Sequence, residues 1–332
     1  MRNNPISASI DFEKEGIQHG FLSLPYSRDD SAWGSVMIPV TQIKNGAGPT
    51  ALLTGGNHGD EYEGPIALFS LAERTDFSNI HGRIIIIPAM NYPAFQKGTR
   101  VSPIDSVNLN RAFPGKPDGT LTEIIADYFS RTLLPMADYV LDIHSGGKTL
   151  DFLPFAACHR LENREHQERC RAAMVAFQAP YQMMMLDIDA QSMYDTQVEN
   201  MGKVFVTTEL GGGGTTTPRT VAIAKRGVDN FLIHSGIMSG ELLACDEEIV
   251  ELDMVDSNCY LFAQHTGLLE PCVSLGDTVQ KGDLMAKLHM TERTAMTPVD
   301  YYANHNGIVI SQHVPSLVKM GDCLYVIADI VN

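Results

Sequence analysis

A histidine and a glutamate three positions apart are the first residues in the chain whose chemistry stands out. His58 and Glu61 belong to the segment Gly-Gly-Asn-His-Gly-Asp-Glu, residues 55–61. In a tight or helical segment, side chains at this spacing point the same way and can hold one small ion. Zinc accepts both an imidazole nitrogen and a carboxylate oxygen as ligands. The spacing alone is a weak motif, so a zinc site needs a third ligand from elsewhere.

His144 is the candidate third ligand. It follows the apolar run Tyr-Val-Leu-Asp-Ile at residues 139–143, which is typical of a buried strand. A second strand-like run, residues 50–54, leads into the His58 segment. The carboxyl ends of parallel strands meet at one edge of a sheet, where ligands gather. Two imidazoles and one carboxylate leave a fourth position open, as in catalytic zinc sites, so we predict one zinc ion per chain.

The residues around this site have predicted supporting roles. The glycines of the segment let the backbone turn tightly beside the imidazole. Asp60 is a candidate hydrogen-bond acceptor behind the metal ligands, and Asp142 could orient its neighbours in the same way.

The elements that must position these residues alternate between strand and helix. Such alternation predicts an α/β fold with a mainly parallel, mixed sheet covered by helices on both faces. Pro39 indicates a strand at a sheet edge, and residues 1–32 are expected to form an arm or an edge segment. Residues 89–119 lack periodicity, which in a loop of that length is typical of a functional segment. Further strands are predicted at residues 35–40, 83–88 and 203–208, and helices at residues 64–74, 120–134, 163–178 and 218–234.

Near residue 240 the sequence changes to short strands and turns. We therefore predict a catalytic α/β domain with an N-terminal arm over residues 1–240, and a β-rich module over residues 241–332. A weak repeat with Gly-Asp turns resembles the folded hammerhead of biotinyl and lipoyl carriers. Those carriers present an acceptor lysine between the two halves, whereas residues 290–304 contain none. We therefore expect a hammerhead-like module without carrier function.

Charge and composition exclude several classes of partner. Asp and Glu total 40 against 24 Lys and Arg, a formal net charge of -16, which argues against binding to nucleic acid or to an anionic membrane. The 6 cysteines are scattered, so neither a thiolate zinc site nor a disulfide framework is predicted. No apolar leader follows Met1 and no run is long enough to span a membrane, so we expect a cytoplasmic protein.

Two other groups of residues receive ordinary interpretations. Residues 183–185, three methionines, are expected to pack in the core rather than bind metal. His159 and His166 lie in a polar, charged stretch, so we expect both to be solvated.

Four segments taken together resemble the succinylglutamate desuccinylase/aspartoacylase family. This family is a branch of the zinc-carboxypeptidase-like fold that hydrolyses N-acyl amino acids. The segments follow in the right order and lie within residues 35–235: they are residues 55–65, 108–115, 142–144 and 208–211. The C-terminal module also resembles the second domain of these enzymes. Within the family, the lead-in at residues 100–105 and the Asn-Leu-Asn-Arg-Ala-Phe-Pro-Gly segment are most similar to bacterial deacetylases of N-acetyl-2,4-diaminobutyrate in ectoine breakdown.

The resemblance implies how an amide bond would be cleaved. The three ligands would hold a zinc ion that lowers the pKa of a bound water to about 7. Glu209, at the end of the strand predicted for residues 203–208, would take a proton from water and pass it to the leaving amine. Arg100 would polarise the scissile carbonyl and stabilise the negative charge that develops on its oxygen.

The resemblance also implies how the substrate, a small N-acyl amino acid, is held. Arg111 with Asn110 would clamp the α-carboxylate, because a guanidinium matches a carboxylate in geometry. The predicted reaction is hydrolysis of N-acetyl-L-2,4-diaminobutyrate to L-2,4-diaminobutyrate and acetate. A cationic diaminobutyrate side chain would need a carboxylate in the pocket, whereas a dicarboxylic substrate would need an extra arginine.

Several alternatives remain open on the sequence alone. Within the same enzyme class, the substrate could be acetylaspartate or succinylglutamate, or the protein could act as a carboxypeptidase. Outside that class, the chain could be a carrier module or a metal-binding protein without catalysis. A homo-oligomer is possible.

Overall fold

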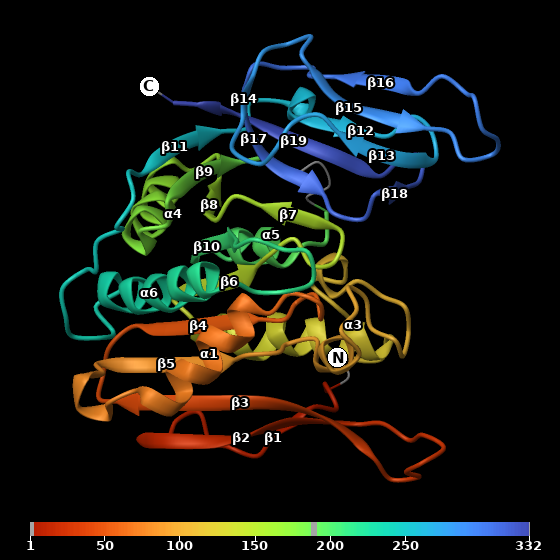
Figure 1. Cartoon of the computed structure of the whole chain (residues 1–332). Coiled ribbons are helices and arrows are strands. Elements are labelled where there is room, and N and C mark those ends of the chain that lie inside the picture. Colours follow the sequence, from red (N-terminus) through yellow and green to blue (C-terminus); the bar gives the residue numbers. More distant parts are fainter. Residues whose placement is uncertain (1–2, 187–190, 332) are drawn as a thin grey trace.

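A long mixed sheet runs through most of the molecule in the computed structural model, which describes residues 3–186 and 191–331 (Figure 1). The sheet has the order β1-β2-β3-β5-β4-β6-β10-β8-β9-β11-β19-β17-β14. Up to residue 253 the strands are β1 (Ser7–Ala8), β2 (Gly16–Pro25), β3 (Ser35–Asn45), β4 (Thr50–Gly55), β5 (Gly82–Ile87), β6 (Tyr139–His144), β7 (Leu150–Phe152), β8 (Phe155–His159), β9 (Tyr181–Met185), β10 (Val204–Glu209) and β11 (Val250–Asp253). The α-helices are α1 (Glu63–Arg74), α2 (Tyr92–Lys97), α3 (Leu121–Tyr128), α4 (Arg164–Phe177), α5 (Tyr194–Asn200) and α6 (Pro218–His234).

The central strands are buried on both faces, which explains their continuous apolar sequences. Successive side chains of a strand point to opposite faces, so Leu53 and Leu52 enter different cores. Leu53 belongs to the core that contains Leu68 of α1, Phe177 of α4 and Phe231 of α6. Leu52 belongs to the core that contains Ile125 of α3 and Tyr194 of α5. The predicted α/β fold with helices on both faces is therefore confirmed.

Pairing of the central strands brings the predicted site residues to one edge of the sheet. Strands β4, β6 and β10 are adjacent and parallel. Gly55 of β4 pairs with Ile143 of β6, and Glu209 of β10 pairs with His144 of β6. The carboxyl ends of the three strands therefore lie side by side.

Most predicted elements are present, but Pro39 does not mark an edge strand. Strand β3 pairs with β2 on one side and with β5 on the other. The pairing with β5 covers Thr41–Asn45 only, so Pro39 lies outside the paired residues. Proline has no backbone N–H to donate, and at this position β5 offers no acceptor that would need one. The expectation of an edge segment at the N-terminus is confirmed, because β1 and β2 end the strand order.

The C-terminal part forms two facing sheets. Its strands are β12 (Tyr260–Phe262), β13 (Gly267–Pro271), β14 (Thr278–Val279), β15 (Leu284–His289), β16 (Val299–Tyr302), β17 (Gly307–His313), β18 (Leu317–Val318) and β19 (Cys323–Ile330). β16, β15, β13 and β18 make a separate sheet, which packs on β17 and β19 through Leu269, Met285 and Leu324. The predicted all-β module is therefore confirmed in its fold.

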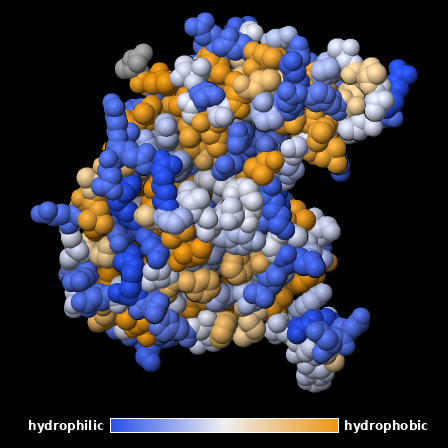
Figure 2. All heavy atoms as spheres, in the orientation of Figure 1, coloured by the Kyte–Doolittle hydropathy of each residue, from blue (hydrophilic) through white to orange (hydrophobic). Residues whose placement is uncertain are grey.

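The C-terminal module is joined to the rest by strand pairing. β11 pairs with β9 and with β19, and β7 pairs with β17. The boundary at residue 240 stays a prediction. The outline of the molecule is hollowed beneath the C-terminal module, on the right in Figure 2. Within residues 3–186 and 191–331, no helix has the length and apolar character needed to cross a membrane.

Candidate active site

His58 and Glu61 lie in the turn that connects β4 to α1, as predicted. β4 ends at Gly55 and α1 begins at Glu63, so both side chains precede the helix. Gly56 has φ +61°, a conformation that favours glycine. A Cβ on Gly59 would lie 2.0 Å from the carbonyl carbon of Ala94, so only glycine fits there. The glycines of the segment therefore allow the turn to pass close to its neighbour.

The three predicted ligands meet at one buried point. His58 Nδ1 lies 2.7 Å from Glu61 Oε1, and His144 Nδ1 lies 2.8 Å from Glu61 Oε2. All three side chains are buried, and their donor atoms lie within 4.8 Å of one another. The group can therefore hold one metal ion.

The outer ring nitrogens of both histidines are occupied by other side chains. His144 Nε2 lies 2.7 Å from Asp142 Oδ2, and His58 Nε2 lies 3.2 Å from Asn108 Oδ1. Metal-bound histidines usually engage their second nitrogen in this way, which fixes the ring and the tautomer. The two Nδ1 atoms are thereby left to face Glu61, as a metal site requires.

Asp142, rather than Asp60, supports the ligands from behind. Asp142 accepts hydrogen bonds from Thr54 Oγ1 at 2.7 Å and from Asn57 Nδ2 at 3.0 Å, so its carboxylate is fixed beside His144. Asp60 instead accepts a hydrogen bond from the backbone N–H of Lys148 at 2.9 Å. It therefore secures the segment that follows β6 and does not contact the rings.

The charges in this cluster shift its pKa values strongly. Burial alone would raise the pKa of Glu61, but attraction to His58 and His144 outweighs it and holds the pKa well below its usual range. Burial lowers the pKa of His58, and the nearby Arg100 lowers it further. Burial opposes protonation of His144 as well, but Asp142 and Glu61 raise its pKa well above the usual value. The cluster thus combines an ionised carboxylate, one imidazole that burial keeps neutral, and one imidazole whose protonated form is favoured by its two carboxylate neighbours; a bound cation would take the place of that proton.

Glu209 lies at the end of β10, beside the proposed ligand His144. Burial raises the pKa of Glu209 to about 8, and repulsion from Glu61 adds to the effect. Its Oε2 atom is buried and has no hydrogen-bond partner among residues 3–186 and 191–331. A carboxylate in that condition is available to a water molecule or substrate, so its placement fits the predicted role of general base.

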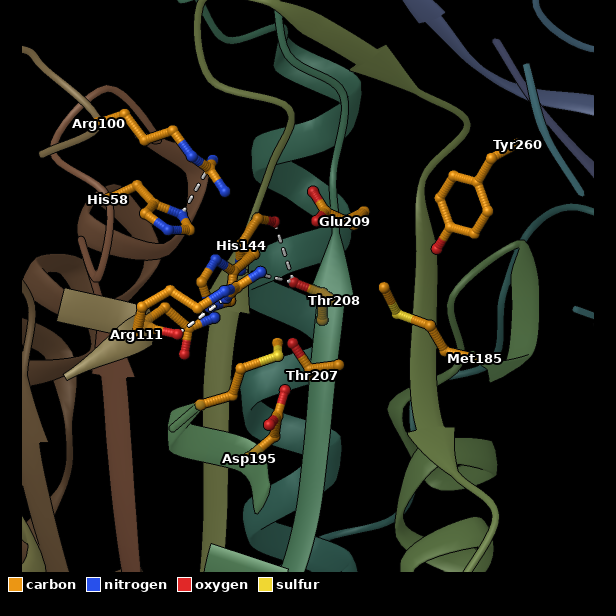
Figure 3. A pocket seen from close by; sticks show the side chains of 12 residues that line it. His58, Arg100, Arg111, His144, Met185, Asp195, Thr207, Thr208, Glu209 and Tyr260 are labelled. Atoms are coloured by element: carbon orange, nitrogen blue, oxygen red, sulfur yellow. Dashed lines mark hydrogen bonds between the residues drawn. The ribbon is translucent and has the colours of Figure 1, made fainter. Parts of the chain in front are cut away.

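The three loop residues predicted to contact substrate line the same cavity as the histidines. Arg100 Nη1 lies 3.3 Å from His58 Nδ1 and 3.5 Å from Glu61 Oε1, so its guanidinium is beside the proposed metal position. Arg111 and Asn110 lie in the 3-10 turn Leu109–Arg111. Figure 3 shows His58, Arg100 and Arg111 on one side of the cavity and Glu209 between them and Tyr260.

Asn110 has a structural role that its sequence did not suggest. Its Oδ1 accepts a hydrogen bond from the backbone N–H of Tyr194 at 2.9 Å, and its backbone carbonyl accepts one from Arg111 at 2.8 Å. Asn110 therefore connects the arginine-bearing turn to helix α5. Its predicted contact with a substrate carboxylate stays a prediction.

The cavity is also lined by residues that were not predicted as site residues from the sequence. It has a volume of about 230 Å³, below the roughly 300–1,000 Å³ typical of pockets for drug-sized ligands, which suits a small amino-acid derivative. Besides the predicted residues it is lined by Met185, Met193, Asp195, Thr207, Thr208 and Tyr260. Thr207 and Thr208 could have been found from their position next to Glu209 in β10, whereas the other four lack such a signal.

Tyr260 brings the C-terminal module into the site. Its hydroxyl donates a hydrogen bond to the backbone carbonyl of Leu186 at 2.8 Å. In Figure 3, Tyr260 and Met185 lie across the cavity from His58 and Arg100. The cavity is therefore closed on one side by strand β12 of the module.

Known proteins resemble this chain over its whole length. Residues 47–235 match the model of the succinylglutamate desuccinylase/aspartoacylase catalytic domain. The chain is 55% identical to the N-alpha-acetyl-L-2,4-diaminobutyric acid deacetylase of Halomonas elongata, with 100% of this chain and 97% of the relative covered.

Two solved structures are closely similar. The product-bound ectoine utilization protein EutE (DoeB) from Ruegeria pomeroyi is 59% identical, with a TM-score of 0.96 and coverage of 99% of this chain and 100% of that one. A succinylglutamate desuccinylase from a Silicibacter strain is 60% identical, with a TM-score of 0.96 and full coverage of both chains.

Proposed function

Since the chain belongs to the succinylglutamate desuccinylase/aspartoacylase family, we propose that it hydrolyses the amide bond of N-acetyl-L-2,4-diaminobutyrate to give L-2,4-diaminobutyrate and acetate. The observation that carries this proposal is the single cavity in which the His58–Glu61–His144 group, Glu209 and Arg111 meet.

We propose zinc as the metal, with one ion per chain held by His58, Glu61 and His144. The donor set supports this choice, because two imidazoles and one carboxylate suit zinc better than they suit the oxygen-preferring Mg²⁺ or Ca²⁺. When bound, such an ion supplies Lewis acidity, which lowers the pKa of water to about 7 and polarises an amide carbonyl.

Glu209 moves the protons of the reaction. Its carboxylate takes a proton from the attacking water and passes it to the amine nitrogen as the amide bond breaks. Among the described residues Oε2 has no hydrogen-bond partner, which supports this role, because none of their side chains competes with water for that atom.

The two arginines hold the substrate. Arg111 binds the α-carboxylate, because a guanidinium can donate two parallel hydrogen bonds to it. Arg100, close to His58 and Glu61, donates to the carbonyl oxygen as negative charge develops there. Both side chains belong to the segment between α2 and α3.

A comparison of three substrates tests the proposal. We expect the zinc-loaded protein to deacylate N-acetyl-L-2,4-diaminobutyrate with a kcat/KM at least about 100-fold above that for N-acetylaspartate or N-succinylglutamate. The extra carboxylates of the latter two would enter the cavity without a dedicated cation, and unpaired buried charges are costly. Initial rates of amine release for the three compounds measure this difference.

The other outcomes separate the alternatives. A preference for succinylglutamate would contradict the proposed substrate and support the activity named for the Silicibacter relative. Cleavage of C-terminal residues from peptides would support a carboxypeptidase. Lack of turnover on every compound, with zinc bound, would support a metal-binding protein without catalysis.

A further inference from the structure

Asp195 is an acidic side chain in the cavity that the proposed chemistry does not use. It lies in the first turn of α5, is 7% exposed, and lines the cavity together with Met193 and Thr207. Figure 3 shows it on the side away from His58 and Arg100, with its carboxylate turned toward Thr207. Buried carboxylates usually have a polar or charged partner, and Thr196 is one partner of Asp195.

The charged groups of the cavity can be matched with those of the substrate we propose. Among the described residues that line it, the carboxylates are those of Glu209 and Asp195, and the guanidinium groups are those of Arg100 and Arg111. Glu209 serves the proton transfers, Arg100 the carbonyl and Arg111 the α-carboxylate. The substrate also carries an ammonium group on its side chain, and Asp195 is the carboxylate among these residues that takes no part in the reaction.

The position of Asp195 is fixed relative to Arg111. The preceding residue, Tyr194, is fully buried, and its ring centroid lies 4.8 Å from that of Phe113. The backbone N–H of Tyr194 donates to Asn110 Oδ1, and Asn110 is the neighbour of Arg111 in the chain. One hydrogen bond therefore connects the turn that bears the guanidinium to the helix that bears the carboxylate.

This arrangement can select substrates by the distance between their two charged groups. In 2,4-diaminobutyrate the α-carboxylate and the side-chain ammonium group lie at opposite ends of a short chain of carbons. A rigid pair of opposite charges, with Arg111 at one side and Asp195 at the other, would favour a molecule whose own two charges match that separation.

We propose that Asp195 is the residue that binds the side-chain ammonium group and thereby sets the preference for a cationic side chain. This inference rests on the proposed deacylase function and deepens it. The carboxylate of Asp195 replaces the water that the ammonium group loses on entering the cavity. An acyl amino acid with a neutral or acidic side chain gains nothing from that contact.

Asp195 also contributes to local structure, and the test must separate the two roles. Thr196 donates hydrogen bonds to Asp195 Oδ1 from its backbone N–H and its hydroxyl. Asp195→Asn keeps an oxygen at that position and removes the charge. Asp195→Glu keeps the charge and moves it by one methylene. Glu199→Gln is the matched control, because Glu199 is on the same helix but pairs with His159 outside this cavity.

The experiment compares two substrates that differ in one charged group, N-acetyl-L-2,4-diaminobutyrate and N-acetyl-L-2-aminobutyrate. For the zinc-loaded Asp195→Asn protein we expect kcat/KM for the first to fall about 100-fold and for the second to change less than about 3-fold. Asp195→Glu should retain part of the preference for the cationic substrate. Glu199→Gln should retain all of it.

A binding measurement separates failure of this inference from failure of the proposed function. Calorimetry should show that the wild-type protein binds 2,4-diaminobutyrate more tightly than 2-aminobutyrate, and that Asp195→Asn removes this difference. Equal losses for both compounds, or no loss for either, would overturn the role of Asp195. A wild type that discriminates in binding through Asp195 but cleaves neither substrate would overturn the proposed function and leave the role of Asp195 intact.

Discussion

Replacing Glu209 by Gln is expected to lower kcat at least about 100-fold and to leave the bound metal in place. General acid-base catalysis typically contributes about 100- to 10,000-fold, and the amide of glutamine cannot accept the proton. Glu209 is not one of the three proposed ligands, so zinc content should stay at the wild-type level. Initial rates and metal analysis on the same sample measure both parts of the prediction.

The pKa of Glu209 affects how this variant is compared with the wild type. Without metal, burial and Glu61 raise this pKa to about 8, and a divalent cation at the neighbouring site would lower it by attracting the carboxylate. Rates should therefore be compared over a range of pH. Glu251→Gln is the control: it makes the same chemical change in β11, where Glu251 forms an ion pair with Arg171. This variant should leave the rate unchanged. Near-normal turnover by Glu209→Gln would show that another group acts as the base.

Replacing His144 by Ala is expected to remove the metal and the activity together. The imidazole is one of the three proposed ligands, and its loss leaves a histidine and a carboxylate, too few to hold zinc tightly. We expect less than about 1% of wild-type turnover, because loss of a supporting partner alone usually costs about 10- to 100-fold in affinity or activity. Zinc affinity by competition with a chelating dye and turnover of the acetylated substrate measure the two losses.

Two further variants serve as controls, one with a smaller expected effect on zinc affinity and one with none. Asp142→Asn keeps the ligand but weakens its outer hydrogen bond, so zinc affinity should fall about 10- to 100-fold. His166→Gln changes a histidine outside the cavity, which contacts the backbone carbonyl of Lys203, and should leave affinity unchanged. If His144→Ala bound zinc as tightly as His166→Gln, the assignment of His144 as a ligand would be wrong.

The convergence of His58, Glu61 and His144 could be predicted because these residues follow local rules. His58 and Glu61 are close in sequence. His144 and Glu209 each stand at the end of an apolar run, a pattern that predicts a buried strand. Parallel pairing then brings strand ends together without further information, as the pairing of Glu209 with His144 illustrates. Local sequence and the geometry of a parallel sheet therefore suffice for this part of the site.

The remainder of the cavity depends on long-range packing. Nothing in the local pattern distinguishes Asp195 from the other acidic residues of the chain. Its place is set by burial of Tyr194 against Phe113 and by the hydrogen bond to Asn110. Tyr260 reaches the cavity from a separate module, so its role follows only from how β11 and β19 join the sheets.

One expectation about a histidine failed. His159 was expected to be solvated, but it ends β8, is buried, and pairs with Glu199 at 2.9 Å. The composition of the neighbouring residues is a poor guide here, because the strand order decides which segments face the interior. The expected core packing of residues 183–185 is confirmed, and Met185 lines the cavity in addition.

The most direct test of the account is a zinc titration of the chelator-treated, metal-free protein, followed by release of acetate from N-acetyl-L-2,4-diaminobutyrate. We expect no turnover without metal. The rate should rise in proportion to added zinc and reach a plateau at one zinc ion per chain. Turnover by the metal-free protein at the rate of the zinc-loaded protein would contradict the central claim.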